Sequence, residues 1–167
     1  MKKMKKLFIL SLFVGMFQVK NYAQISGGAN LGTMISDGEA IFGVTLNGKY
    51  ELNDKLKIGA NLGYFSKKTE FLGSSLRYSI MPITGLVEYK LIENKLNPYA
   101  GLDLGFYRFG IAGFSATYLG LAPTTGINYE IDDKLSINGN FKFHYILSSE
   151  LSSSGLININ AGISYKL

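Results

Sequence analysis

Apolar and polar residues alternate along most of the chain after residue 23. Between residues 157 and 167, one face of an extended chain would carry only isoleucine, alanine, tyrosine and leucine. The other face would carry only asparagine, glycine, serine and lysine. A period of two recurs over 42–52, 56–64 and 135–145, and no stretch shows sustained helical periodicity. Because successive side chains of a strand point to opposite faces, this pattern predicts an all-β protein.

Short polar turns divide the chain and give the number of strands. Asn53-Asp54-Lys55, Glu93-Asn94-Lys95 and Asp132-Asp133-Lys134 recur at intervals of 39 or 40 residues. Looser connections are expected between them, at 36–39, 67–74, 110–116 and 147–154. Three tight turns and four longer loops connect eight strands. The predicted strands are 24–34, 40–52, 55–67, 76–91, 96–109, 117–131, 134–146 and 155–167.

Four tyrosines occupy equivalent places in this pattern. Tyr50, Tyr89, Tyr129 and Tyr165 lie on the apolar face, near the ends of the second, fourth, sixth and eighth predicted strands. In an up-and-down barrel those four strand ends share one side. Tyrosine favours a membrane interface because its ring is apolar and its hydroxyl stays hydrated. The four tyrosines therefore predict an aromatic girdle.

The polar face carries too many charges to be a dry core. Its members include Lys49, Lys57, Glu88, Asp103 and Lys142, interspersed with glycine, asparagine, serine and threonine. A soluble barrel has the opposite pattern, with large apolar residues inside and charges outside. We therefore expect an eight-stranded antiparallel transmembrane barrel with lipid around its apolar face. We expect side chains to plug the lumen and each inward carboxylate to lie near a lysine.

Charges near the strand ends have a different expected environment. The residues concerned are Glu51, Lys90, Glu130 and Lys166. Their positions at the strand ends put them at the mouth of the barrel, and water is expected to solvate them there.

The first 23 residues have the pattern of a secretory signal peptide. Four lysines within residues 1–6 precede an apolar run from Leu7 to Phe17, and Ala23 provides a small residue for cleavage. The apolar run is shorter than the roughly 18 residues that a spanning helix needs. No cysteine is present to carry a lipid or a disulfide. We therefore predict a cleaved signal peptide at 1–23 and one barrel domain at 24–167.

Removing this segment changes the meaning of the basic composition. The sequence has 17 basic and 12 acidic residues, and five of the lysines lie within residues 1–20. The predicted mature chain then has 12 residues of each sign. A basic protein would suggest a nucleic-acid partner, but here the excess charge belongs to the targeting segment. No nucleic-acid partner is expected.

The C-terminal strand resembles an assembly signal. Asn160, Gly162, Tyr165 and Leu167 are similar to the polar, glycine, aromatic and hydrophobic positions that the barrel assembly machinery recognises, although leucine replaces the commoner final phenylalanine. The chain from 24 to 167 thus resembles the small eight-stranded outer-membrane β-barrel proteins of the OmpX-like and PorT-like kind. The resemblance implies an outer-membrane address in a Gram-negative bacterium, and periplasmic chaperones and the assembly machinery as partners. It implies no particular activity.

Candidate chemistry is sparse. His144 is the only histidine, so a site built from several histidines is excluded. Outer-membrane lipid A deacylases, which are also eight-stranded barrels, combine a His-x-Ser pair with an acid, and His144, Ser148 and Glu150 are the candidates here. Position 146 is isoleucine, however, and the alternation turns His144 toward the lumen. We therefore expect no catalytic, metal or cofactor site.

The expected function follows from these features. The sequence predicts a non-enzymatic integral outer-membrane protein with an envelope-structural or surface-interaction role. Outer-membrane lipid and lipopolysaccharide would surround it, and its surface ligand is left open. The alternatives are an enzyme that modifies lipid A and a secreted ligand-binding barrel.

Overall fold

The computed structural model describes residues 24–36, 38–71, 74–111, 113–147 and 155–167. Side chains within 70–75 lie outside this description. The described residues form eight strands. Their bounds are β1 Ile25–Ser36, β2 Glu39–Glu51, β3 Leu56–Phe71, β4 Ser74–Lys90, β5 Leu96–Ile111, β6 Phe114–Glu130, β7 Leu135–Leu147 and β8 Gly155–Lys166.

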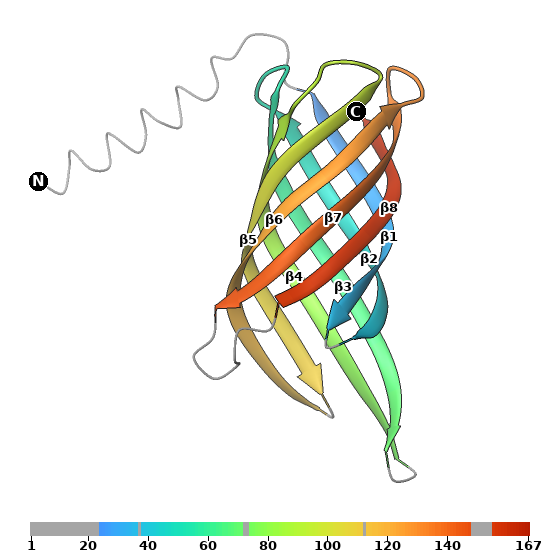
Figure 1. Cartoon of the computed structure of the whole chain (residues 1–167), viewed down its shortest axis with the longest axis vertical. Helices are drawn as coiled ribbons and strands as arrows, with labels where there is room; N and C mark the ends of the chain where they lie inside the picture. The colour runs from blue at the N-terminus through green and yellow to red at the C-terminus, as the bar shows by residue number, and fades with distance from the viewer. Residues whose placement is uncertain (1–23, 37, 72–73, 112, 148–154) are drawn as a thin grey trace, which may run out of the picture.

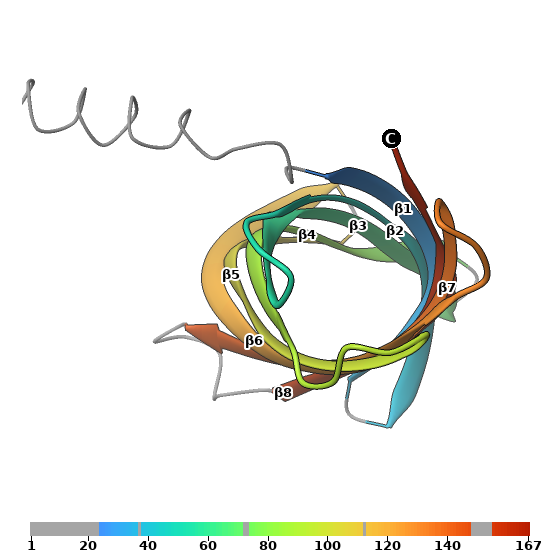
Figure 2. The same ribbon diagram turned by 90° about the horizontal axis from the view of Figure 1, so that it is seen from above.

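The strands form one closed antiparallel barrel in chain order. Each strand pairs with its neighbours in sequence, and β1 pairs with β8 from Ser26 opposite Lys166 to Ile35 opposite Ile157. The strands tilt around the barrel (Figure 1), and the view from above shows a single ring (Figure 2). Without closure, β1 and β8 would be edge strands. Their pairing gives each of them a second hydrogen-bonding partner, so the sheet has no open edge. The predicted fold class is confirmed.

Two ends of the barrel are distinguished by their connections. The turn end carries Gln24, Leu167 and the three short turns; the loop end carries the other connections. At the turn end, the backbone amides of Lys55 and Leu56 donate to Asn53 Oδ1 at 3.0 and 2.8 Å. Asp132 Oδ1 accepts equivalent bonds from Lys134 and Leu135 at 2.8 and 2.7 Å. These backbone hydrogen bonds also lower the pKa of Asp132. The side chains of Asn53 and Asp132 therefore stabilise these turns by accepting hydrogen bonds from the amides that follow.

Two predicted loops are wrong in their extent. The segment 67–74 was expected to be a loop, yet the β3–β4 ladder continues from Lys67 opposite Tyr78 to Phe71 opposite Ser74. Likewise, β5 and β6 extend through most of 110–116, and Ile111 pairs with Phe114. Outside a bilayer both faces of a strand meet water, so polar residues such as Lys67 and Lys68 can continue a strand that has no apolar face. In β3 these polar residues therefore mark the exit from lipid rather than the end of the strand.

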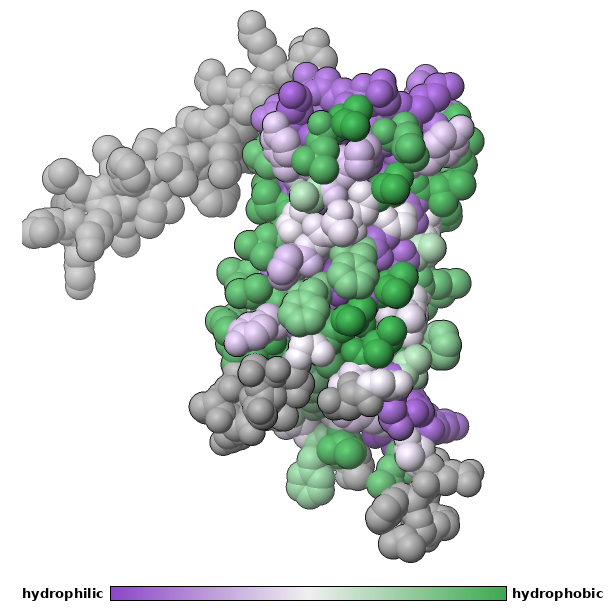
Figure 3. Space-filling view, in the orientation of Figure 1, coloured by the Kyte–Doolittle hydropathy of each residue, from purple (hydrophilic) through white to green (hydrophobic). Residues whose placement is uncertain are grey.

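The outer wall of the barrel is largely apolar. Leu31, Phe42, Leu104, Phe106 and Ile163 are between 55% and 73% exposed. Polar neighbours on the other face are buried, among them Asn30 at 5% and Asp103 at 2%. Figure 3 shows hydrophobic residues along the wall and hydrophilic residues gathered at the turn end. The described residues include no helix long and apolar enough to cross a membrane. Exposure of one face and burial of the other follow the predicted alternation.

Leu46 and Asn47 test this alternation at adjacent positions. Leu46 is 54% exposed on the outer wall, four positions from Tyr50, whereas Asn47 points inward. Leu46→Lys should destabilise the barrel by roughly 2–4 kcal/mol, because a charge near the middle of the bilayer loses its hydration. Asn47→Lys should cost clearly less because its neighbours are polar. Chemical unfolding in lipid vesicles measures both variants, and equal losses would contradict the assignment of faces.

Candidate functional site in the barrel interior

The interior of the barrel contains three layers of side chains along its axis. Nearest the turn end lies a group of lysines and carboxylates, which we call the charged rim. A network centred on Asp103 follows. An apolar cluster lies toward the loop end. All three layers come from the inward positions of the strands, so the period of two places them there.

The charged rim consists of four ion pairs. Lys49 Nζ lies 2.8 Å from a carboxylate oxygen of Glu88, and both side chains are at most 10% exposed. Glu51 accepts from two lysines and Glu130 from one. The distances are 2.5 Å for Lys57–Glu51, 3.7 Å for Lys90–Glu51 and 3.6 Å for Lys166–Glu130. Each carboxylate of the rim therefore has a lysine within ion-pair distance.

The rim corrects the expectation for the charges near the strand ends. Glu51 and Lys90 were expected to be solvated at the mouth, yet their side chains are only 11% and 12% exposed. Lys166 and Glu130 are 22% and 33% exposed. The barrel is narrow, so inward side chains from opposite strands converge and cover one another even close to the opening.

Asp103 on β5 is the centre of the second layer. Its side chain is 3% exposed, and Lys142 Nζ on β7 donates to Oδ2 at 2.6 Å. Asn61 Nδ2 on β3 donates to the same oxygen at 2.7 Å. Thr84 Oγ1 on β4 is 3.4 Å from Oδ2, and Thr124 Oγ1 on β6 is 3.3 Å from Oδ1. Five consecutive strands thus converge on one carboxylate.

This arrangement compensates for burial of the Asp103 charge. A carboxylate removed from water without partners costs several kcal/mol even after relaxation. Asp103 has one cation and three neutral donors, so both of its oxygens are engaged. Lys142, whose side chain is 9% exposed, depends on Asp103 in turn. Removal of either residue would leave the other buried without its ionic partner.

Asparagines extend the polar layer toward β8 and β1. Asn160 Nδ2 donates to Asn140 Oδ1 at 2.9 Å and to Asn158 Oδ1 at 2.5 Å. Asn158 Nδ2 in turn donates to the backbone oxygen of Thr33 at 3.0 Å. These bonds connect β7, β8 and β1. The closing pair of strands is therefore connected by side chains as well as by its backbone ladder.

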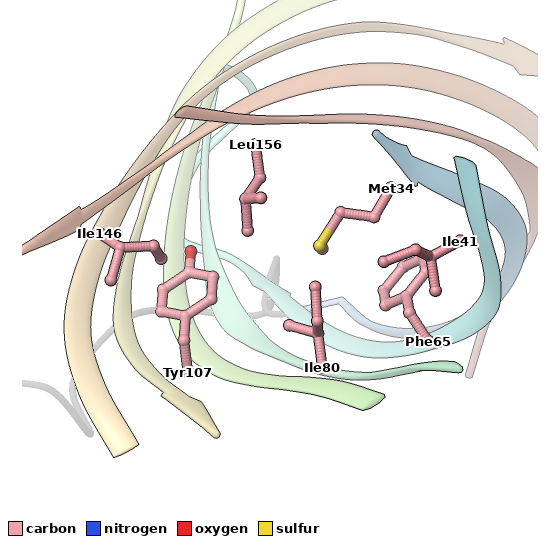
Figure 4. Packing of buried hydrophobic residues seen from close by; sticks show 7 residues of the cluster. All are labelled: Met34, Ile41, Phe65, Ile80, Tyr107, Ile146 and Leu156. Carbon is pink, nitrogen blue, oxygen red and sulfur yellow. The ribbon is translucent and has the colours of Figure 1, made fainter. Parts of the chain in front are cut away.

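The third layer is an apolar cluster near the loop end. Its members are at most 3% exposed and come from seven different strands (Figure 4): Met34, Ile41, Phe65, Ile80, Tyr107, Ile146 and Leu156. The Tyr107 hydroxyl lies 2.8 Å from His144 Nδ1, and the two rings meet edge to face at 5.3 Å. This contact joins the apolar cluster to the polar layers. Buried apolar area here stabilises the barrel from inside.

The four tyrosines lie at outward positions near the turn end, as the alternation predicts. Tyr89, Tyr129 and Tyr165 are 47–48% exposed on the outer wall near the turn end, and Tyr50 is half-buried. Ile25 lies opposite Tyr50, and Leu135 lies opposite Tyr165. Their location suits an interfacial girdle, and that role stays a prediction.

Residues of the predicted C-terminal assembly signal also have structural roles in the barrel. Asn160 is 4% exposed inside the barrel, whereas Tyr165 and Leu167 point outward. A Cβ at Gly162 would collide with the Ala29 backbone oxygen and with Asn30 across the β1–β8 seam. Gly162 is therefore needed for β8 to approach β1. Recognition by assembly factors stays a prediction beside this structural role.

Of the three candidate catalytic residues, the structure describes only His144. His144 is 3% exposed inside the barrel, in contact with Tyr107 rather than with the lipid-facing wall. Ser148 and Glu150 lie outside the described residues. Among the described residues, no cluster of three or more histidines and carboxylates could hold a metal ion.

Sequence reasoning missed two groups in the interior. Thr84 and Thr124 were not singled out as partners of Asp103, although both lie on inward positions of their strands. The apolar cluster was also missed, although Met34, Ile80 and Leu156 lie on inward positions of their strands. Both groups could have been identified by extending the alternation over the full length of each strand and listing every inward residue.

These features define the class of protein: an eight-stranded transmembrane β-barrel with an apolar wall and a paired, polar interior. Residues 9–166 match the family model for the outer membrane protein beta-barrel domain. The chain belongs to this family. The family is that of bacterial outer-membrane barrels, as the resemblance implied. A comparison with curated proteins finds no match.

Solved structures show the same fold at low sequence identity. Neisserial surface protein A is 16% identical, with a TM-score of 0.67 over 87% of this chain and 97% of that one. OprG from Pseudomonas aeruginosa is 16% identical, with a TM-score of 0.63 over 87% and 95%. Ail of Yersinia pestis, solved in complex with the heparin analogue sucrose octasulfate, is 16% identical, with a TM-score of 0.61 over 87% and 97%. At identities this low, the likeness shows only that the folds are similar.

Asp103 offers a direct test of the interior network. Asp103→Asn should destabilise the folded barrel by about 3–5 kcal/mol, because Lys142 would remain buried without an anionic partner. The double variant Asp103→Asn with Lys142→Met should lose much less than the two single losses together. Denaturant unfolding in vesicles, analysed as a double-mutant cycle, measures this coupling.

Lys55→Met provides the matched control. Lys55 lies 3.7 Å from Glu93 in an ion pair that is about half exposed. Its loss should cost at most about 1 kcal/mol. If Asp103→Asn cost no more than this control, the interior pair would not hold the barrel together.

Proposed function

We propose that the protein is a non-enzymatic integral outer-membrane barrel whose lumen is closed by its own side chains. The observation that carries this proposal is that three layers of packed side chains follow one another along the barrel axis. Charged rim, Asp103 network and apolar cluster each draw side chains from opposite sides of the ring. Eight strands leave an interior just wide enough for such side chains, whereas porins use about sixteen or more strands. A diffusion pore is thus disfavoured.

An enzymatic role has little support in the geometry. His144 is the only histidine, and its imidazole lies inside the barrel against Tyr107. A lipid substrate would approach from the outer wall, on the opposite side of the strand from His144. A general base must lie within hydrogen-bond reach of its substrate. The interior histidine fits a packing role better than catalysis on lipid.

A secreted ligand-binding barrel is disfavoured by the outer wall. Many large apolar side chains around the ring are 40–73% exposed. Monomeric soluble proteins rarely expose a continuous apolar surface of this kind. Lipid is the environment that such a wall favours, and family membership agrees with it. The predicted signal peptide at 1–23 would export the chain to that location.

The loop end is the surface on which we place an interaction role. The β3–β4 and β5–β6 hairpins project farthest from the barrel there (Figure 1). Beside the apolar cluster, Tyr78, Phe109, Tyr118 and Ile146 line an apolar hollow of about 370 Å³. Ail of Yersinia pestis, which has a similar fold, was solved in complex with a heparin analogue. That complex supports a role in surface recognition for this barrel as well.

We further propose outer-membrane lipid and lipopolysaccharide as its surroundings, and chaperones and the assembly machinery as its partners in biogenesis.

Orientation is the first test of this proposal. The turn end should face the periplasm and the loop end the exterior. Phe114 at the loop end is 81% exposed, and Asp133 lies in an exposed turn. On intact cells, a membrane-impermeant maleimide should label Phe114→Cys and leave Asp133→Cys unlabelled until the outer membrane is permeabilised. The reverse pattern would place the interaction surface at the wrong end.

Conductance tests the closed lumen. The folded protein in planar bilayers should show no steady single-channel current, because paired charges and packed apolar side chains leave no continuous water path. A sixteen-stranded porin reconstituted in parallel supplies the positive control. Large, stable current steps from the protein would contradict the proposal, whatever the orientation experiment shows.

A further inference from the structure

The sequence contains only two arginines, and both point outward from the barrel. Arg108 on β5 lies between the inward Tyr107, which is fully buried, and the half-buried Phe109. Arg77 on β4 precedes the inward Tyr78 and is exposed. All the cations of the charged rim and the Asp103 network are lysines paired inside the barrel. The arginines are thus set apart by both type and position.

Both arginines line one depression in the outer wall near the loop end. Its volume is about 480 Å³, and Ser79, Gly110 and Ser115 form part of its surface. Arg108 donates from a guanidinium nitrogen to Ser115 Oγ at 3.2 Å. Gly110 lies opposite Ser79 in the ladder, and a Cβ added there would approach Ser79 Oγ to 2.8 Å. The small residues leave room between the two guanidinium groups.

The depression lies at the level of the far membrane interface. Arg77 precedes Tyr89 by 12 positions on β4. A tilted strand advances about 2.5 Å per residue along the barrel axis, so Arg77 lies roughly 30 Å from the tyrosine level. The apolar band of such barrels is about 25 Å tall. Arg108 pairs with Met81, four positions nearer the tyrosines, and its long side chain can reach the same interface.

The charge around the depression is positive. Lys68 on β3 is exposed and lies directly opposite Arg77 in the ladder, which adds a third cation on the outer face. No carboxylate is among the described residues that line the depression. Met81 lines the side of the depression that faces the tyrosines. Beyond it the wall continues with Ile83 and Phe106, which are 51% and 59% exposed. A cationic site therefore adjoins an apolar surface.

We propose that this depression binds the phosphorylated sugar headgroup of an outer-leaflet glycolipid. A planar guanidinium can donate two parallel hydrogen bonds to one phosphate, which a lysine cannot do. The serine hydroxyls can donate to sugar or phosphate oxygens. Acyl chains would then lie against Met81, Ile83 and Phe106. The inference rests on the proposed orientation, which brings the loop end to the outer leaflet.

Binding of lipid A to the purified, folded barrel in detergent tests the site without depending on orientation. Native mass spectrometry should detect one retained bisphosphorylated lipid A per barrel. Arg77→Gln with Arg108→Gln should weaken retention by roughly tenfold or more, because two charge-assisted contacts are lost. Arg77→Lys with Arg108→Lys should recover only part of it. The gel mobility of unboiled samples verifies that each variant is folded.

Lys55→Gln with Lys95→Gln is the matched control. It removes the same charge at the turn end, where both lysines are exposed, and should bind lipid A like the unsubstituted protein. Equal weakening in this control would reduce the effect to overall charge and overturn the proposal. Unchanged binding by the arginine-to-glutamine variant would also overturn the proposal. The proposal would fail as well if the unsubstituted protein retained phosphatidylglycerol, or lipid A stripped of its phosphates, equally well.

Discussion

A sheet surrounded by lipid must satisfy all of its backbone hydrogen bonds within itself. Lipid offers no partner to an open strand edge, and each unpaired backbone group there costs several kcal/mol. In this chain the requirement is met where β1 pairs with β8 over ten residue pairs, from Ser26–Lys166 to Ile35–Ile157. Gly162 permits that contact because no side chain stands between it and Ala29. Everything else in the structure depends on this seam.

Closure with eight strands then determines what the interior can contain. Inward side chains meet across a space that they fill themselves. Charges in that space must be compensated nearby, which is why Asp103 receives donors from four other strands. Apolar side chains replace polar ones toward the loop end, where Phe65, Ile80 and Tyr107 pack together. The interior is thus partly an ion-pair network and partly an ordinary apolar core.

Sequence reasoning recovered those parts of the structure that repeat. Alternation identified the faces of the strands, and Asn53 and Asp132 marked turns whose side chains bond the following amides. The extent of β3 was underestimated, because polar residues such as Lys68 no longer signal a loop once a strand has left the bilayer. β6 also begins earlier than predicted, at Phe114. Contacts across the barrel were out of reach. That Asn61 and Thr124 meet at Asp103 depends on the stagger of five strands, which no local pattern encodes.

Spin-label accessibility along β7 tests most directly whether the barrel has lipid around its apolar wall and a packed interior. Labels placed singly from 135 to 141 in reconstituted protein should alternate. Odd positions such as Ile137, which is 47% exposed, should be accessible to oxygen dissolved in lipid and shielded from a water-soluble nickel complex. Even positions such as Asn138, 5% exposed, should be shielded from both reagents. Access of the nickel complex to the even positions would reveal a water-filled lumen, and access to the odd positions would remove the barrel from lipid altogether.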